Sequence, residues 1–114
     1  MTTPNEELKR KLEALKRTFA VTLNTRLGEI EAALARLRSD APLADQVDTI
    51  KTLLEQAHKI AGSAGTFGYG QVSVIASETE QLCDSIIKGK HGADQPALGS
   101  LAAKVAALRE QSVQ

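Results

Sequence analysis

Apolar residues recur every three or four positions along most of the chain, the spacing that places side chains on one face of an α-helix. The first such stripe occupies the N-terminal third and consists of Leu8, Leu12, Leu15, Phe19, Leu23, Leu27, Ile30, Leu34 and Leu37. It predicts an N-terminal helical region over residues 4–38, with Thr3 as the N-cap and Pro4 in the first turn. Residues of low helix propensity gather from Thr22 to Gly28, and we expect a break or bend between residues 16 and 22.

Three more helices are predicted downstream. Apolar stripes indicate helices over about 43–65, about 70–88 and about 95–111. Gly89 is a candidate C-cap for the third, and Pro96 a candidate first-turn residue of the fourth. No alternating strand pattern occurs. We therefore predict an all-α fold, an antiparallel four-helix bundle with an additional N-terminal helix segment, built as a single domain from residues 1–114.

The composition narrows the range of partners. Acidic and basic residues balance at 14 each, and aromatic residues make up only 3% of the chain. No net charge attracts nucleic acid or an anionic membrane, and no apolar run approaches the roughly 20 residues that span a bilayer. The lone Cys83 cannot form an internal disulfide, and the charged N-terminal stretch does not resemble a secretory signal. We expect a cytoplasmic protein in which Cys83 is a small core residue.

The segment AHKIAGSAGTFGYG, residues 57–70, carries the candidate chemistry. At 100° per residue, His58 lies about a quarter turn from the centre of the apolar face of the helix predicted over about 43–65. Gly62 and Gly65 fall within about 40° of His58 around the same helix. These glycines could allow a neighbouring helix to pack closely or simply end the helix. Alternatively, they leave a bare surface on which another protein can reach the imidazole, a nucleophile able to carry a phosphoryl group near pH 7.

The sequence around His58 resembles the signature of histidine phosphotransfer (HPt) domains, which reads histidine, two residues, lysine, glycine, five residues, glycine. The matching residues are His58, Gly62 and Gly68, with Phe67 before the last glycine. The resemblance implies an antiparallel four-helix bundle whose histidine takes a phosphoryl group from the aspartate of one receiver domain and gives it to another. It implies a phosphocarrier, not an enzyme with an ATP-binding or autokinase motif.

Site roles follow from the same resemblance. His58 would be the phospho-accepting residue and Gly62 the small residue that leaves room for the receiver. The surrounding docking surface would include Leu54, Ala61 and Gly65. Glu80, in the next helix, stands where relatives often carry glutamine or an acidic group near the histidine, which is a weaker match.

The partners implied are response regulator receiver domains and a hybrid histidine kinase. We expect no cofactor in this chain, with Mg²⁺ held in the acidic pocket of the receiver. The N-terminal stripe has roughly heptad spacing and could pack inside the bundle or against a second copy. We favour a monomer, because the docking surface of this family is formed by a single copy of the chain.

One position departs from the family pattern. Ala61 stands where the signature has lysine, whereas Lys59 follows the histidine directly and lies about 100° around the helix from it. Lys51, two turns earlier on nearly the same stripe, is another possible cation. The substitution at Ala61 bears on the rate of transfer and on the lifetime of phosphohistidine.

The residues around His58 also allow interpretations other than phosphotransfer. The main alternative is a helical adaptor that docks a receiver domain or a partner helix without carrying phosphate. Glu55 and His58 form a Glu-x-x-His pair, but a di-iron site needs a second copy and two more inward carboxylates. The other histidine, His91, falls in a predicted loop, and we expect it to be a solvated residue.

Overall fold

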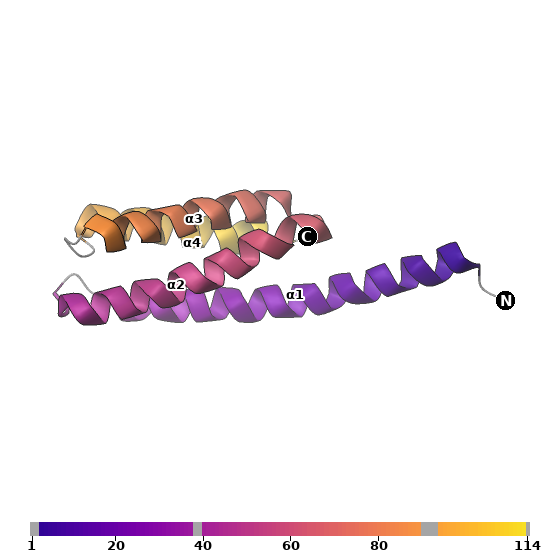
Figure 1. The fold of residues 1–114 in the computed structure, drawn as a ribbon, viewed down its shortest axis with the longest axis horizontal. Coiled ribbons are helices and arrows are strands. Elements are labelled where there is room, and N and C mark those ends of the chain that lie inside the picture. Colours follow the sequence, from indigo (N-terminus) through magenta and orange to yellow (C-terminus); the bar gives the residue numbers. More distant parts are fainter. Residues whose placement is uncertain (1–2, 38–39, 90–93, 114) are drawn as a thin grey trace.

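The computed structural model describes residues 3–37, 40–89 and 94–113, and over these residues it contains four α-helices and no strand. Helix α1 spans Pro4–Arg36, α2 spans Leu43–Ala64, α3 spans Gly70–Gly89 and α4 spans Gln95–Gln111. A single 3-10 turn, η1, covers Gly65–Phe67 between α2 and α3. Successive helices run in opposite directions (Figure 1). The predicted all-α, antiparallel four-helix architecture is confirmed.

Helix α1 is continuous, so the break expected between residues 16 and 22 is wrong. The hydroxyls of Thr18 and Thr25 donate to the carbonyls of Ala14 and Val21, each at 3.1 Å, within an unbroken helix. The helix buries its apolar side chains on the bundle from Phe19 onward. Packing of an amphipathic face contributes more to helix stability than intrinsic propensity does, and it outweighs the weak residues here.

The helix starts use the expected capping chemistry. At α1, the Thr3 side chain accepts from the Glu6 amide while the Glu6 carboxylate accepts from the Thr3 amide, and Pro4 occupies the first turn. This reciprocal pair satisfies two amides that the helix itself leaves without partners. At α4, Asp94 is the N-cap, its side chain accepting from Ala97 at 2.9 Å, and Pro96 lies in the first turn.

The core is a set of aliphatic side chains supplied by all four helices. Its largest fully buried members are Leu23, Leu27, Ile30, Ile50, Leu53, Ile60, Leu101, Leu108, Val72, Thr79 and Cys83. Ile60 of α2 is fully buried at the edge of the apolar stripe that lies away from Gly62 and Gly65. The helical spacing also predicts Ala102 on the apolar face of the last helix, but Ala102 is exposed. Leu8, Leu12 and Leu15 also lie outside the core.

Cys83 is a buried core residue, as predicted. Burial raises the pKa of its thiol to about 12, and the charge of Glu80 adds to this effect. A thiol in this state is a poor nucleophile, because the reactive form of cysteine is the thiolate. Cys83 therefore contributes packing and no chemistry.

Polar contacts tie the helices to one another around this core. Arg109 of α4 donates to both carboxylate oxygens of Glu31 and to Asn24 Oδ1 on α1. Lys104 of α4 pairs with Glu78 of α3 at 3.3 Å. Helix α2 packs most extensively on α3, and this pair of helices positions the histidine.

The molecule is elongated, measuring 63 × 21 × 19 Å along its principal axes. The N-terminal part of α1 extends past the ends of the other three helices (Figure 1). The predicted additional N-terminal segment is therefore the unpacked continuation of α1. None of the described helices is long and apolar enough to cross a membrane.

Candidate functional site

Helix α2 presents His58 on the side that faces solvent. Its neighbour Ala57 and the residue Ile60 are fully buried and fix the rotation of the helix on the core. The His58 side chain is 71% exposed. The imidazole lies beside the buried stripe and is open to an approaching molecule, as the helical spacing indicates.

Glu80 of α3 holds the imidazole in one orientation. Its Oε1 lies 2.8 Å from His58 Nδ1, and the carboxylate is only 29% exposed. A carboxylate can only accept a hydrogen bond, so Nδ1 carries the proton. The lone pair of the neutral ring then resides on Nε2, the nitrogen on the other side of the ring. The pairing with Glu80 thus leaves Nε2 as the nucleophilic atom.

The two glycines near His58 differ in their surroundings. A Cβ placed on Gly62 would meet no atom within 4 Å, so no neighbouring helix packs against this position. A Cβ on Gly65 would make ordinary contact with the Ser73 side chain at 3.8 Å. The close-packing interpretation is therefore wrong for Gly62. Both glycines are exposed and leave a bare surface next to the histidine.

The candidate cations lie on the surface of α2. Lys59 and Lys51 are both exposed, and neither forms an ion pair with any residue described in the structure. Ala61, at the position of the signature lysine, packs half-buried against the core, and its carbonyl accepts a 2.9 Å hydrogen bond from Ser73 of α3. The methyl group of Ala61 thus lies at the seam between α2 and α3, where it brings no charge.

The end of the motif forms a tight turn. Gly68 adopts φ of +88°, a left-handed conformation that favours glycine. The Phe67 ring stacks on Phe19 of α1 with centroids 4.8 Å apart, and Tyr69 contacts the same ring at 5.5 Å. The Tyr69 amide donates to Ala64 at 3.0 Å. These contacts fix the start of α3, and with it the position of Glu80.

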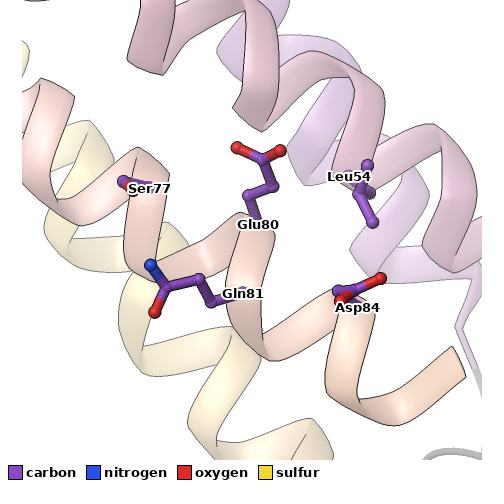
Figure 2. A pocket seen from close by; sticks show the side chains of 5 residues that line it. All are labelled: Leu54, Ser77, Glu80, Gln81 and Asp84. Carbon is purple, nitrogen blue, oxygen red and sulfur yellow. The ribbon is translucent and has the colours of Figure 1, made fainter. Parts of the chain in front are cut away.

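A shallow groove of about 350 Å³ adjoins the histidine between α2 and α3. Figure 2 shows Glu80 reaching from α3 toward α2, with the remaining lining side chains around it: Leu54, Ser77, Gln81 and Asp84. Ser77, Gln81 and Asp84 were not among the residues predicted for the site. Their spacing of three or four residues from Glu80, or direct adjacency to it, is the signal that could have found them. The groove extends the surface on which a partner can contact the molecule beside His58.

The residues described by the structure contain no group of three or more histidine, cysteine, aspartate or glutamate side chains placed to hold a metal ion. Glu55 is exposed on α2 and does not join His58, whose partner is Glu80. His91 lies outside the described residues.

An exposed imidazole oriented by a carboxylate thus lies on the flank of an antiparallel helical bundle. The chain belongs to the Hpt domain family, whose sequence model matches residues 14–111. Members of this family act in two-component phosphorelays by phosphotransfer through a histidine, and they are phosphocarriers that interact with receiver domains and histidine kinases. Comparison with curated proteins and with solved structures gave no match.

Proposed function

We propose that His58 accepts a phosphoryl group from the aspartyl phosphate of a receiver domain and passes it to the aspartate of a second receiver. The observation that carries this proposal is the 2.8 Å contact between His58 Nδ1 and Glu80 on an imidazole that is 71% exposed. This contact leaves the Nε2 lone pair directed away from the bundle. An exposed, oriented nucleophile is what transfer between two proteins requires.

In the forward step, the Nε2 lone pair attacks phosphorus in line with the acyl phosphate bond. The N–P bond forms as the P–O bond to the receiver aspartate breaks, and that carboxylate leaves with the electron pair. The ring keeps its proton on Nδ1 and becomes cationic. Glu80, 2.8 Å from Nδ1, stabilises this developing charge.

The second step reverses the first. A carboxylate oxygen of the second receiver attacks phosphorus, the P–N bond breaks, and the electron pair returns to Nε2. The imidazole leaves as a neutral group with its proton still on Nδ1. No proton has to enter or leave the site in either direction, which suits a histidine with a single fixed partner.

The docking surface in this proposal centres on the exposed backbone at Gly62 and Gly65, which carries no side chains, and it is bordered by Leu54 and Ala61. The groove along α3 continues this surface. Lys59 and Lys51 are the cations of α2 available to the phosphoryl group, and both reach it only through their long side chains. Mg²⁺ is supplied from the acidic pocket of the receiver, where it would neutralise the transferring group.

We further propose a cytoplasmic monomer that relays phosphate between a hybrid histidine kinase and a response regulator. The site needs residues from α2 and α3 of one copy only. The chain has equal numbers of acidic and basic residues. Recognition of a partner therefore depends on shape and on the local surface around His58.

The experiment uses receiver domains phosphorylated with a radioactive label and incubated with the wild-type protein and with His58→Gln. We expect acid-labile, alkali-stable label on the wild-type chain and none on the variant. If receivers bind both proteins alike and no label moves in either direction, the chain is an adaptor and not a carrier. Label that survives His58→Gln would also overturn the proposal.

A further inference from the structure

The N-terminal arm, defined as residues 4–18 of α1, projects from the bundle, and its apolar face is not buried by any of the residues that the structure describes. Every residue of the arm is exposed, and Phe19 is the first buried one, at 6%. Fifteen helical residues extend about 22 Å. Figure 1 shows this arm running past the ends of α2, α3 and α4.

Three leucines of the arm continue the face that α1 buries farther along. Leu8, Leu12 and Leu15 remain 59%, 46% and 52% exposed. At 100° per residue they lie with Phe19 within an arc of about 60°. The side of α1 that contacts α2 and α4 in the bundle therefore extends outward as a narrow apolar stripe, which indicates a binding surface for one more helix.

The arm is specified as a helix by its own sequence. The capping box between Thr3 and Glu6 closes its first turn, and Pro4 is compatible with that position. Short helices in water are marginal unless packing supports them. The capped arm therefore presents its leucines on a regular helix, on which the helix of a partner protein can pack.

Charge distinguishes between the possible partners. Lys9 and Lys16 lie about 70 to 90° to one side of the stripe, and Lys11 about 70° to the other. Glu6 and Glu13 lie on the far face of the helix. None of the three lysines forms an ion pair with a residue described in the structure. The charged residues nearest the apolar stripe are thus basic on both sides, and Glu7, about 110° from the centre of the stripe, lies farther round the helix than the three lysines.

A second copy of the chain fits this pattern poorly. A parallel pair of arms would place Lys11 of one copy against Lys16 of the other, and an antiparallel pair would place Lys9 against Lys16. Like charges in these flanking positions repel. A membrane surface also fits poorly, since interfacial helices present a broad apolar face with aromatic residues, whereas this stripe is narrow and purely leucine.

We propose that the arm binds an amphipathic α-helix of a partner protein whose narrow apolar stripe is flanked by acidic residues, forming a short coiled coil that lengthens the bundle. Acidic flanks would pair with Lys9, Lys11 and Lys16 while apolar residues cover the leucines. The match to the Hpt family begins at residue 14, so Leu8 and Leu12 lie outside the part shared with that family. This interaction is additional to phosphotransfer at His58.

The test uses two synthetic peptides, each about three heptads long with leucine at both core positions. One carries glutamate at the flanking positions and the other carries lysine. Fluorescence anisotropy with the full chain is expected to show binding of the acidic peptide at least tenfold tighter than of the basic one. The difference should shrink in high salt, because screening weakens exposed charge pairs.

Three variants complete the experiment. The triple variant Leu8→Ser, Leu12→Ser, Leu15→Ser should lose at least tenfold in affinity for the acidic peptide. Exchanging Lys9, Lys11 and Lys16 for glutamate should reverse the peptide preference. The matched control exchanges Arg10 and Arg17, on the far face, for glutamate and should leave the preference unchanged.

Four results would overturn the proposal. They are equal binding of the two peptides, binding of neither, leucine-dependent dimerisation of the wild-type chain in light scattering, and leucine-dependent binding to vesicles of neutral and anionic phospholipid in place of the peptide. Every residue of the arm is exposed, so the variants should keep the helical circular dichroism and thermal transition of the remaining helices. Phosphotransfer from an isolated receiver should also continue in these variants, which separates this proposal from the one at His58.

Discussion

At the scale of single residues, the site depends on which imidazole nitrogen carries the proton. The 2.8 Å contact with Glu80 assigns that proton to Nδ1 of His58 and leaves Nε2 free. The same carboxylate lies against the ring when the ring becomes positively charged. Glu80 therefore positions the nucleophile and stabilises its charged product without touching the phosphoryl group itself.

Replacing Glu80 tests this role. Glu80→Ala should slow transfer from a phosphorylated receiver about three- to tenfold, equivalent to about 0.7 to 1.4 kcal/mol. Glu80→Gln should retain more of the rate, because its amide oxygen can still accept from Nδ1 although it brings no charge. Nitrogen-15 NMR of the imidazole should show the Nδ1–H tautomer in the wild type and a mixture in Glu80→Ala.

The matched control is Glu78→Ala, which removes a carboxylate of the same helix that pairs with Lys104. Its transfer rate and its His58 tautomer should equal those of the wild type. A tautomer mixture in the wild type, or an unchanged tautomer in Glu80→Ala, would show that Glu80 does not orient the ring.

Gly62 has open space around it, so its effects on folding and on docking can be separated. Gly62→Ala should stabilise the protein by about 0.5 to 1 kcal/mol, because glycine weakens a helix by that amount relative to alanine. Gly62→Gln should instead lower transfer from a receiver at least tenfold by filling the bare surface next to the histidine. Urea denaturation and the transfer assay measure the two effects.

Gly28 provides the control for Gly62. It is an exposed glycine of α1 where a Cβ would also meet no atom within 4 Å. Gly28→Ala should give a similar gain in stability, and Gly28→Gln should leave transfer unchanged. If a folded Gly62→Gln protein accepted phosphate from a receiver at the wild-type rate, this glycine would not belong to the docking surface.

Residue-level features were predictable only where they depend on a single helix. The exposed edge position of His58 and the two glycines beside it followed from the 100° rotation per residue. The contact with Glu80 depends on the register between α2 and α3, which no periodicity within one helix encodes. The resemblance to the HPt family identified Glu80 only as a weak match. Neither Gln81 nor Asp84 was predicted as part of the site.

At the scale of the elements, the helices were predictable and the continuity of α1 was not. The apolar stripes predicted the all-α fold, and the N-cap Thr3 and the first-turn residue Pro96 marked two helix starts. The expected break in α1 rested on intrinsic propensity alone. It failed because the bundle supports the helix from Phe19 onward, a tertiary effect that a local scale does not contain.

The turn between α2 and α3 is the element that places Glu80 opposite His58. Gly68→Ala should destabilise the fold by about 1 to 2 kcal/mol, because a Cβ is strained at φ of +88°. Urea denaturation measures this loss. Gly70→Ala is the control, since Gly70 lies nearby in open space without a positive φ. Equal effects of the two substitutions would contradict the argument from backbone conformation.

At the scale of the whole molecule, Arg109 joins α4 to α1 through Glu31. The hydrogen bond from Arg109 holds the pKa of Glu31 below its ordinary value of 4.5. A lowered carboxylate pKa stabilises the fold above the unfolded pKa, and this stabilisation is lost as pH falls through the folded value. The Glu31 side chain is 41% exposed, so solvent limits the effect.

Glu31→Gln should therefore lower the free energy of unfolding at pH 7 by about 0.2 to 1 kcal/mol, the range for exposed ion pairs. The difference from the wild type should shrink as the pH falls below 4.5. Urea denaturation across this pH range measures it. Glu29→Gln, an exposed carboxylate on the same helix without an ion pair among the residues described, should show little change.

The central claim is that Nε2 of His58 carries the phosphoryl group. The most direct measurement is phosphorus-31 and nitrogen-15 NMR of the labelled protein after incubation with a phosphorylated receiver domain. We expect one phosphohistidine, with phosphorus bonded to Nε2 of His58 and the proton retained on Nδ1, and no such signal in His58→Gln. Phosphorus on Nδ1, or on any other residue, or its absence from a protein that binds the receiver, would contradict this claim.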